Sequence, residues 1–345
     1  MQTLLDDIGS FPLPHFVERE TFEKAYEQAR MWAAEGRDFM DNEFLFKNFH
    51  RVIISSFKMK FESGLDIVNY PQHYDICRQF TDEIRKAMEK GTYIVDEKYA
   101  VIPEVYSISR EAKKLCEEFG KEKIALRVCV TGPMELYLKM VGTTVYKDVL
   151  LMFAETTRRY AKNSLLNSKY VKTEVVSIDE PSFGFCDVSA EKEAVIDVLE
   201  EAFDFSGAVK QIHVHSMSRI TDILEVKNLD VVSIEYASSP KNLDFISMNM
   251  LEKSDKHVRV GVSRTDIDAI IAELYEMGIY EPQSWQLVED ENKIRKRFEK
   301  AKEKFGERMT FAGPDCGLGG WPDQEAAQML LKNTVAAVKA AQSFS

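Results

Sequence analysis

The feature that most constrains this chain is a repeated alternation of short apolar runs and longer amphipathic stretches. Each run is rich in Val, Ile, Leu or Phe and ends at a polar, Gly or Pro residue, as a buried parallel strand does. Because neighbouring parallel strands need helical crossovers, eight such runs separated by helices predict a single (β/α)8 TIM barrel. The runs cover residues 4–10, 65–70, 124–132, 174–180, 209–216, 229–235, 257–263 and 308–313.

The stretches between these runs have apolar residues at three- and four-residue spacing, which predicts helices over 43–63, 145–166 and 190–205. The long interval from 10 to 65 predicts extra helices after the first strand, with a junction near 41–47. An open doubly wound sheet is the alternative. It is disfavoured because no GxGxxG follows the first run and no GxxxxGK[ST] occurs. One domain spanning residues 1–345 is therefore expected.

Composition narrows the classes of function. The chain has 45 Lys and Arg against 57 Asp and Glu, a formal charge of −12, and no concentrated basic tract, which disfavours nucleic-acid binding. No apolar run reaches the ~20 residues needed to cross a bilayer, and the acidic start is unlike a secretory signal. A cytoplasmic location is expected because the cysteines are few, scattered and without a CxxC pair. They are Cys77, Cys116, Cys129, Cys186 and Cys316.

The carboxyl ends of the predicted strands, where a barrel builds its active site, carry zinc-binding side chains. His213 and His215 are two apart on one strand, so both face the same side. Glu235 ends the next strand, ~4.8 Å away, and Cys316 lies in GPDCGLGG. An isolated HxH is more often a pair of core polar residues. Two imidazoles, a carboxylate and a thiolate at one rim favour a zinc site instead.

Several motifs indicate a family. IGSFPLP near the start, VTGPMELYL (130–138), VVSIDEPSF (175–183), IHVHS, VVSIEYASS (231–239) and AGPDCGL (312–318) follow the order seen in cobalamin-independent methionine synthases. The chain resembles the zinc-bearing catalytic barrel of that family, in particular its short single-barrel versions, from about Ile8 to the final helix. The wider clan includes uroporphyrinogen-decarboxylase-like methyltransferases that work with corrinoid proteins.

The resemblance implies a ligand set for zinc. The family's HxC motif corresponds to His213 and His215, with His215 in place of the Cys, and its other ligands correspond to Glu235 and Cys316. A second register would make His215 the family His and Met217 its Cys. The first register is preferred because it supplies four competent ligands, whereas a thioether is a poor zinc ligand. No catalytic residue beyond the metal site is expected.

The resemblance also implies substrate contacts. The family's contacts correspond to Ile8, Gly9, Ser10 and Asp179. A Glu of the family, which holds the amino group of the substrate, aligns with Asn69-Tyr70, so this amino-acid clamp is missing. Tyr70 in its place suits a flat aromatic or uncharged ligand.

These features predict a zinc-dependent methyltransferase that moves a methyl group between a small substrate and a corrinoid carried by a partner protein. Demethylation of a methoxylated aromatic compound is the main interpretation, because imidazole in place of thiolate makes the ion harder and the clamp is lost. S-methylation of homocysteine or a related thiol with methylcobalamin is the alternative. A metal-free, non-catalytic binding barrel is a third reading. The corrinoid partner is expected because 345 residues leave no room for the family's second, folate-binding barrel.

Overall fold

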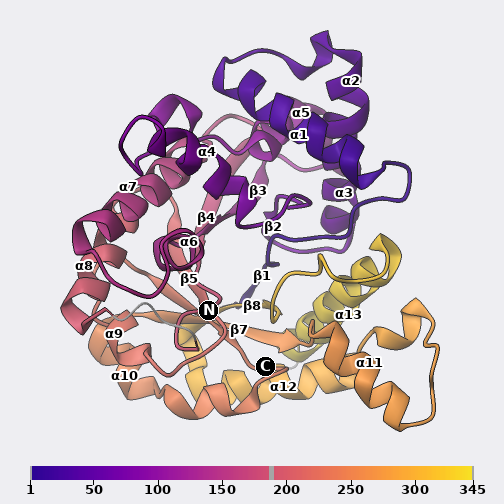
Figure 1. The fold of residues 1–345 in the computed structure, drawn as a ribbon. Coiled ribbons are helices and arrows are strands. Elements are labelled where there is room, and N and C mark those ends of the chain that lie inside the picture. Colours follow the sequence, from indigo (N-terminus) through magenta and orange to yellow (C-terminus); the bar gives the residue numbers. More distant parts are fainter. Residues whose placement is uncertain (1, 186–189, 344–345) are drawn as a thin grey trace.

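The computed structural model describes residues 2–185 and 190–343, and in these ranges the chain forms one eight-stranded parallel sheet. The spatial order is β1-β8-β7-β6-β5-β4-β3-β2, so the strands follow one another around a curled sheet with helices outside it (Figure 1). Every predicted strand is present, and the TIM-barrel fold is confirmed. The strands are β1 (Leu4–Leu5), β2 (Val68–Asn69), β3 (Ile124–Thr131), β4 (Val171–Asp179), β5 (Val209–Val214), β6 (Val231–Glu235), β7 (His257–Ser263) and β8 (Met309–Pro314).

The seam between β1 and β2 is the irregular part of the barrel. Both strands are only two residues long, and two isolated parallel bridges extend their pairing. One bridge joins Asp6, just after β1, to Ile67, just before β2, and the other joins Ser10 to Gln72. Carboxylates complete the pairing, because Asp66 accepts the backbone N–H of Leu5 and Asp7 accepts that of Asn69, both at 2.8 Å. Both strands lie within the predicted runs 4–10 and 65–70, but each is shorter than predicted.

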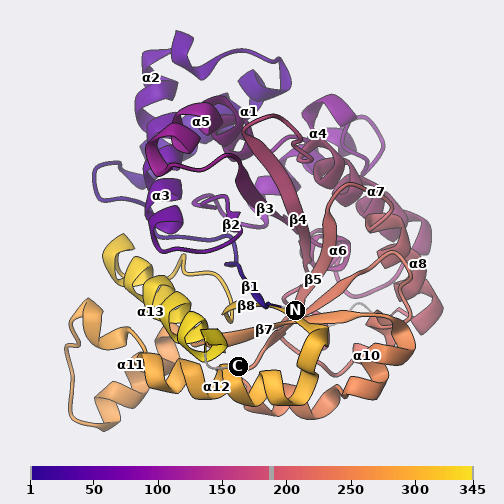
Figure 2. The same ribbon diagram turned by 180° about the vertical axis from the view of Figure 1, so that it is seen from behind.

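Helices cover the outer face of the sheet on all sides seen in Figures 1 and 2. The expected extra helices after β1 are present as α1, α2 and α3, and a π-helical turn at residues 46–50 joins the last two. The helices are α1 (Arg19–Ala34), α2 (Glu43–Leu45), α3 (Arg51–Glu62), α4 (Arg78–Met88), α5 (Pro103–Phe119), α6 (Pro133–Met140), α7 (Lys147–Asn163), α8 (Lys192–Ala202), α9 (Ile220–Ile223), α10 (Met248–Ser254), α11 (Ile267–Glu276), α12 (Glu291–Phe305) and α13 (Gln324–Ser343).

A layer of paired charges crosses the interior of the barrel. Asp6 lies between two fully buried arginines, with Oδ1 2.6 Å from Nε of Arg259 and Oδ2 3.4 Å from Nε of Arg127. Next to it, Nζ of the buried Lys60 lies 2.6 Å from Oδ2 of Asp7 and donates to the carbonyl of Gly9 at 3.0 Å. These contacts attach the segment after β1 to the barrel wall.

The remaining sequence expectations concern cysteines and membranes. Cys77, Cys116, Cys129 and Cys316 are free cysteines, and Cys116 on α5 and Cys129 on β3 are buried; Cys186 lies outside the described residues. No helix in the described ranges is long and apolar enough to cross a membrane.

Candidate metal centre

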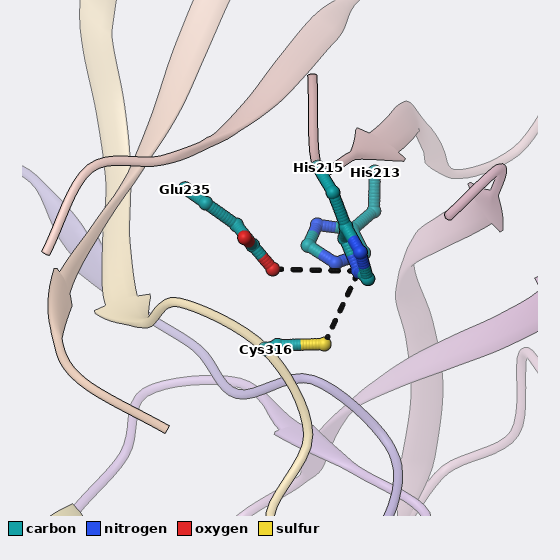
Figure 3. Close-up of side chains that lie close together, drawn as sticks. All are labelled: His213, His215, Glu235 and Cys316. Carbon is teal, nitrogen blue, oxygen red and sulfur yellow. Dashed lines mark hydrogen bonds and ion pairs between the residues drawn. The ribbon is translucent and has the colours of Figure 1, made fainter. Parts of the chain in front are cut away.

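Four side chains from three strand ends converge at the carboxyl end of the barrel (Figure 3). His213 lies on β5 and His215 just beyond it, Glu235 ends β6, and Cys316 follows β8. One ligand atom from each lies within 4.8 Å of all the others. Nε2 of His215 is 3.3 Å from Oε1 of Glu235 and 3.5 Å from Sγ of Cys316. Zinc bonds of ~2.0–2.3 Å in a tetrahedron keep ligand atoms ~3.3–3.8 Å apart, so the cluster matches the size of such a site.

The environment of His213 leaves one ring nitrogen available as a ligand. Nδ1 lies 3.2 Å from Oγ of Ser233, while Nε2 is buried and has no hydrogen-bond partner among the described residues. Burial lowers the pKa of His213, and the neighbouring His215, Arg259 and Arg127 lower it further. The ring is therefore neutral at physiological pH, as metal coordination requires. In the tautomer whose Nδ1–H donates to Oγ of Ser233, Nε2 carries the lone pair that a metal would take.

Among the described residues, the two acidic members of the cluster have no ion pair with a Lys or Arg side chain, and Arg259 acts on Glu235 only as a minor opposing charge. Burial raises the pKa of Glu235 to about 8, and the nearby Asp315 adds to this effect. Burial also raises the pKa of the Cys316 thiol, helped by the charge of Glu235. A carboxyl and a thiol destabilised as anions beside two neutral imidazoles are what a divalent cation would stabilise. The donor set therefore fits a metal ion.

Asp315 brings the loops of Glu235 and Cys316 together. Its buried carboxylate accepts the backbone N–H groups of Tyr236 and Ala237 at 2.9 Å and that of Ser238 at 2.6 Å. Gly261 on β7 makes room for this carboxylate, since a Cβ there would lie 2.1 Å from Oδ1. Asp315, the residue before Cys316, thus holds the three residues that follow Glu235.

Asn242 performs the same task between β5 and β6. Its Nδ2 donates to the carbonyl of His215 at 3.0 Å and to that of Glu235 at 2.9 Å. Sequence reasoning missed both Asn242 and Ser233, because nothing in their local sequence shows what they contact. Met217, the ligand of the alternative register, is fully buried in the hydrophobic core.

Comparisons with known proteins find methionine synthases that are similar in sequence and in fold. No family model matches the chain. A methionine synthase of Methanocaldococcus jannaschii is 24% identical over 309 residues, which are 86% of this chain and 90% of that protein. The solved B12-independent methionine synthase of Shewanella sp. W3-18-1, in complex with selenomethionine, superposes with a TM-score of 0.62 at 14% identity, covering 100% of this chain and 99% of that one. The resemblance to the cobalamin-independent methionine synthase family is confirmed.

The segment of Ile8, Gly9 and Ser10, which the resemblance implies as a substrate contact, lies directly against the loop of Cys316. The carbonyl of Ser10 accepts the N–H of Leu318 at 2.8 Å, and its Oγ accepts that of Gly319 at 3.2 Å. A Cβ at Gly317 would lie 2.0 Å from Oγ of Ser10, so glycine permits this close approach. Ile8 and Gly9 precede Ser10, and Lys60 holds the carbonyl of Gly9.

The IDEP motif of the methionine synthase resemblance has two roles in the structure. Asp179 pairs in register with His213 and accepts a hydrogen bond from Ser177 at 2.5 Å, and burial raises its pKa to about 6. Glu180 is fully buried and accepts the N–H groups of Met134 and Glu135, at 2.9 and 2.7 Å, so it caps α6. The first residue lies beside a candidate metal ligand, and the second builds the neighbouring loop.

Asn69 and Tyr70, which the resemblance aligns with a Glu of the family, have different surroundings. Tyr70 is fully buried in the core, and its hydroxyl donates to the carbonyl of Cys129 at 2.9 Å. The side chain of Asn69 is also fully buried, but both of its polar atoms lack a partner among the described residues. Its Nδ2 would be 3.2 Å from a Cβ placed on Gly9. Asn69 rather than Tyr70 therefore faces the segment expected to hold the substrate, and a role of Tyr70 in binding stays a prediction.

Proposed function

We propose that this protein is a zinc-dependent methyltransferase that methylates a thiol of the homocysteine type. The observation that carries the proposal is the His213–His215–Glu235–Cys316 cluster at the mouth of a barrel that resembles methionine synthases. Thiol methylation, the alternative in the sequence analysis, thereby gains support over demethylation of a methoxylated aromatic compound.

The four residues of the cluster would hold the ion, and Ser233, Asn242 and Asp315 would hold the ligands in place. The chemistry that zinc would supply there is a lower pKa for a bound thiol, which would favour the nucleophilic thiolate at neutral pH. Hydrogen bonds to the residues that bind a metal orient these residues and set their basicity.

The segment of Ile8, Gly9 and Ser10 would bind the substrate close to the ion, because it packs on the loop of Cys316. Asp179 would contact the substrate from the neighbouring strand end, beside His213. The methyl donor would be methylcobalamin or a methylated corrinoid protein that docks at the mouth of the barrel.

Demethylation of a methoxylated aromatic remains a second candidate, favoured by one observation. His215 lies in the cluster in place of a thiolate ligand, which suits an oxygen substrate better than a sulfur one. The metal-free barrel is disfavoured, because four side chains of metal-binding type keep their ligand atoms within 4.8 Å of one another.

The test combines metal analysis with two assays of the full chain. We expect about one equivalent of zinc, and methionine formation from homocysteine as methylcobalamin is consumed. Cys316→Ser should weaken zinc binding by more than about 100-fold and abolish activity. Cys116→Ser, which changes a buried thiol on α5, should leave both unchanged.

Three outcomes would contradict the proposal. Less than about a tenth of an equivalent of zinc after careful handling would favour the metal-free barrel. Methyl transfer from a methoxyaromatic to reduced corrinoid protein, without any thiol methylation, would favour demethylation. Normal activity of Cys316→Ser would remove the metal centre from the mechanism.

A further inference from the structure

The segment between β7 and α12, residues 264–290, forms an arm that the proposed function does not use. The arm contains α11 and projects from the barrel wall beside α12 and α13 (Figures 1 and 2). α11 consists largely of Ile, Ala, Leu and Tyr, yet of its ten residues, all of which the structure describes, Ile270 alone is buried. The apolar face of a helix is normally covered, so this exposed surface points to a further contact.

The most exposed apolar side chains of the arm lie at and after the end of α11. Tyr275, Met277 and Tyr280 are 60%, 67% and 68% exposed, and the two tyrosine rings lie 4.7 Å apart. We call these three residues the tip. Single exposed hydrophobic residues are ordinary on a protein surface, but a group of large ones marks an interaction site.

A groove lies next to the tip, between the arm and α13. Its volume is about 400 Å³, and its apolar wall consists of Leu274, Trp285, Val288 and Met329. Trp285 is 63% exposed although it is a large aromatic side chain. A tip and a groove on one surface suit a two-fold dimer, because each copy can insert its tip into the groove of the other.

The charges of the arm limit what can cover it. Between residues 265 and 291 the chain has eight Asp and Glu residues and no Lys, Arg or His. Glu276 and Glu281, which precede Met277 and follow Tyr280, are exposed and form no ion pair among the described residues. Contact of one tip with another would bring like charges together, so the covering surface has to supply positive charge.

The chain itself carries such a surface, on α12. Lys293, Lys296 and Lys300 lie on one face of this helix, because they are three and four residues apart, and all three are exposed and without an ion pair in the described ranges. The net charge of −12 makes most of a second copy repulsive to the arm, so this row of lysines is the attractive part. Glu289, which lines the groove, lies 2.6 Å from Arg297 of α12, so the groove and α12 adjoin.

We propose that the face formed by the tip, the groove and the lysines of α12 is the interface of a two-fold symmetric homodimer. The tip of each copy enters the groove of the other, and its Glu276 and Glu281 approach the α12 lysines of that copy. The central contact is apolar and charged contacts surround it, as in other specific interfaces. This inference does not depend on the proposed function.

Sedimentation velocity of the full chain, at protein concentrations from about 1 to 100 µM, measures the oligomeric state. The wild type should reach twice the mass of one chain, which is 39.6 kDa. Tyr280→Ser, in the tip, and Trp285→Ser, in the groove, should each raise the dissociation constant of the dimer by at least about 30-fold, as expected for aromatic residues at the centre of an interface. The matched control, Tyr146→Ser, replaces a tyrosine that is 56% exposed just before α7, across the barrel from α11 in Figure 1, and should leave this constant unchanged.

Charge reversal identifies the occupant of the arm. One variant carries Glu276→Lys and Glu281→Lys, and a second carries Lys293→Glu and Lys296→Glu. Each variant alone should be monomeric, since both charged contacts of its dimer would join like charges. An equimolar mixture of the two should form a dimer again, because every tip then faces an α12 of opposite charge, and this restoration also shows that both variants are folded.

The inference is wrong if the wild type keeps the mass of one chain up to about 100 µM. It is equally wrong if a dimer persists in both aromatic variants, because the interface would then lie elsewhere. A mixture of the two charge variants that stays monomeric would also overturn it, since the lysines of a second copy would then not be what covers the arm.

Discussion

The barrel contains two clusters of buried ionisable groups, and they differ in how their charges are balanced. In the interior layer, Asp6 has Arg127 and Arg259 within 3.4 Å, and Asp7 has Lys60 at 2.6 Å. In the metal centre, Glu235 and Cys316 face two imidazoles whose pKa values are lowered by burial. Both clusters are buried, but among the described residues only the first pairs its carboxylates with Arg or Lys side chains.

This difference separates structural charges from functional ones. A buried ion pair is complete within the chain, and its loss leaves an uncompensated charge in the core. The candidate metal centre differs, because burial raises the pKa of its carboxyl and its thiol, and neither forms an ion pair with a described Lys or Arg. Ser233 links the two clusters, since its Oγ lies 3.2 Å from His213 and accepts from Arg259 at 3.4 Å.

The largest expected effect comes from breaking the interior layer. Arg259→Met should lower the free energy of unfolding by about 3–5 kcal/mol, because Asp6 loses its closest partner in a fully buried position. Urea denaturation of the metal-free protein measures it. Arg295→Met, which removes a partly exposed i,i+4 partner of Glu299, should cost less than about 1 kcal/mol. A similarly small cost for Arg259→Met would show that the interior charges are not structural.

Particular residues show how much of this arrangement the sequence could predict. The β-branched runs located every strand, and the period-two spacing of His213 and His215 placed both rings in one cluster. The same alternation puts Asn69 and Tyr70 on opposite faces. Applied there, it would have directed attention to Asn69, because only one of the two can face the barrel interior. The role of Tyr70 in binding rests on the resemblance and stays a prediction.

Other parts of the site could not be predicted, because they depend on contacts distant in sequence. Asp315 binds the loop of residues 236–238, and Asn242 joins the ends of β5 and β6. The short length of β1 and β2 also depends on distant contacts, because the side chains of Asp66 and Asp7 accept backbone N–H groups of these two strands. A local pattern carries no information about such partners.

A smaller effect should appear where the two clusters meet. Ser233→Ala removes the partner of Nδ1 of His213, so zinc affinity should fall by about 10-fold, as for other groups that orient a metal-bound histidine. Competition with a chromophoric chelator measures the affinity. Ser63→Ala, which removes a hydroxyl that donates to the carbonyl of Met59, is the control and should leave zinc affinity unchanged. An unchanged affinity in Ser233→Ala would mean that the interior layer and the metal centre are independent.

The smallest effect concerns Glu104, which has neither the counter-charge of the interior layer nor a place in the metal centre. This carboxyl on α5 is fully buried, both of its oxygens lack partners among the described residues, and burial raises its pKa to about 8. Because the ordinary pKa is 4.5, the folded state holds a proton that the unfolded state releases between these values, so stability falls as pH rises through this window.

Glu104→Gln removes that proton linkage while keeping the shape of the side chain. We expect the variant and the wild type to be equally stable near pH 4, and the variant to be more stable by about 1 kcal/mol or more above pH 8. Thermal unfolding across this pH range measures the difference, with the exposed Glu122→Gln as control. A difference that does not depend on pH would mean that Glu104 stays charged in the folded protein. A carboxylate that stays charged in such a buried position needs a cationic partner, as Asp6 has. Glu104 would then belong with the paired charges of the interior layer rather than with the unpaired ones.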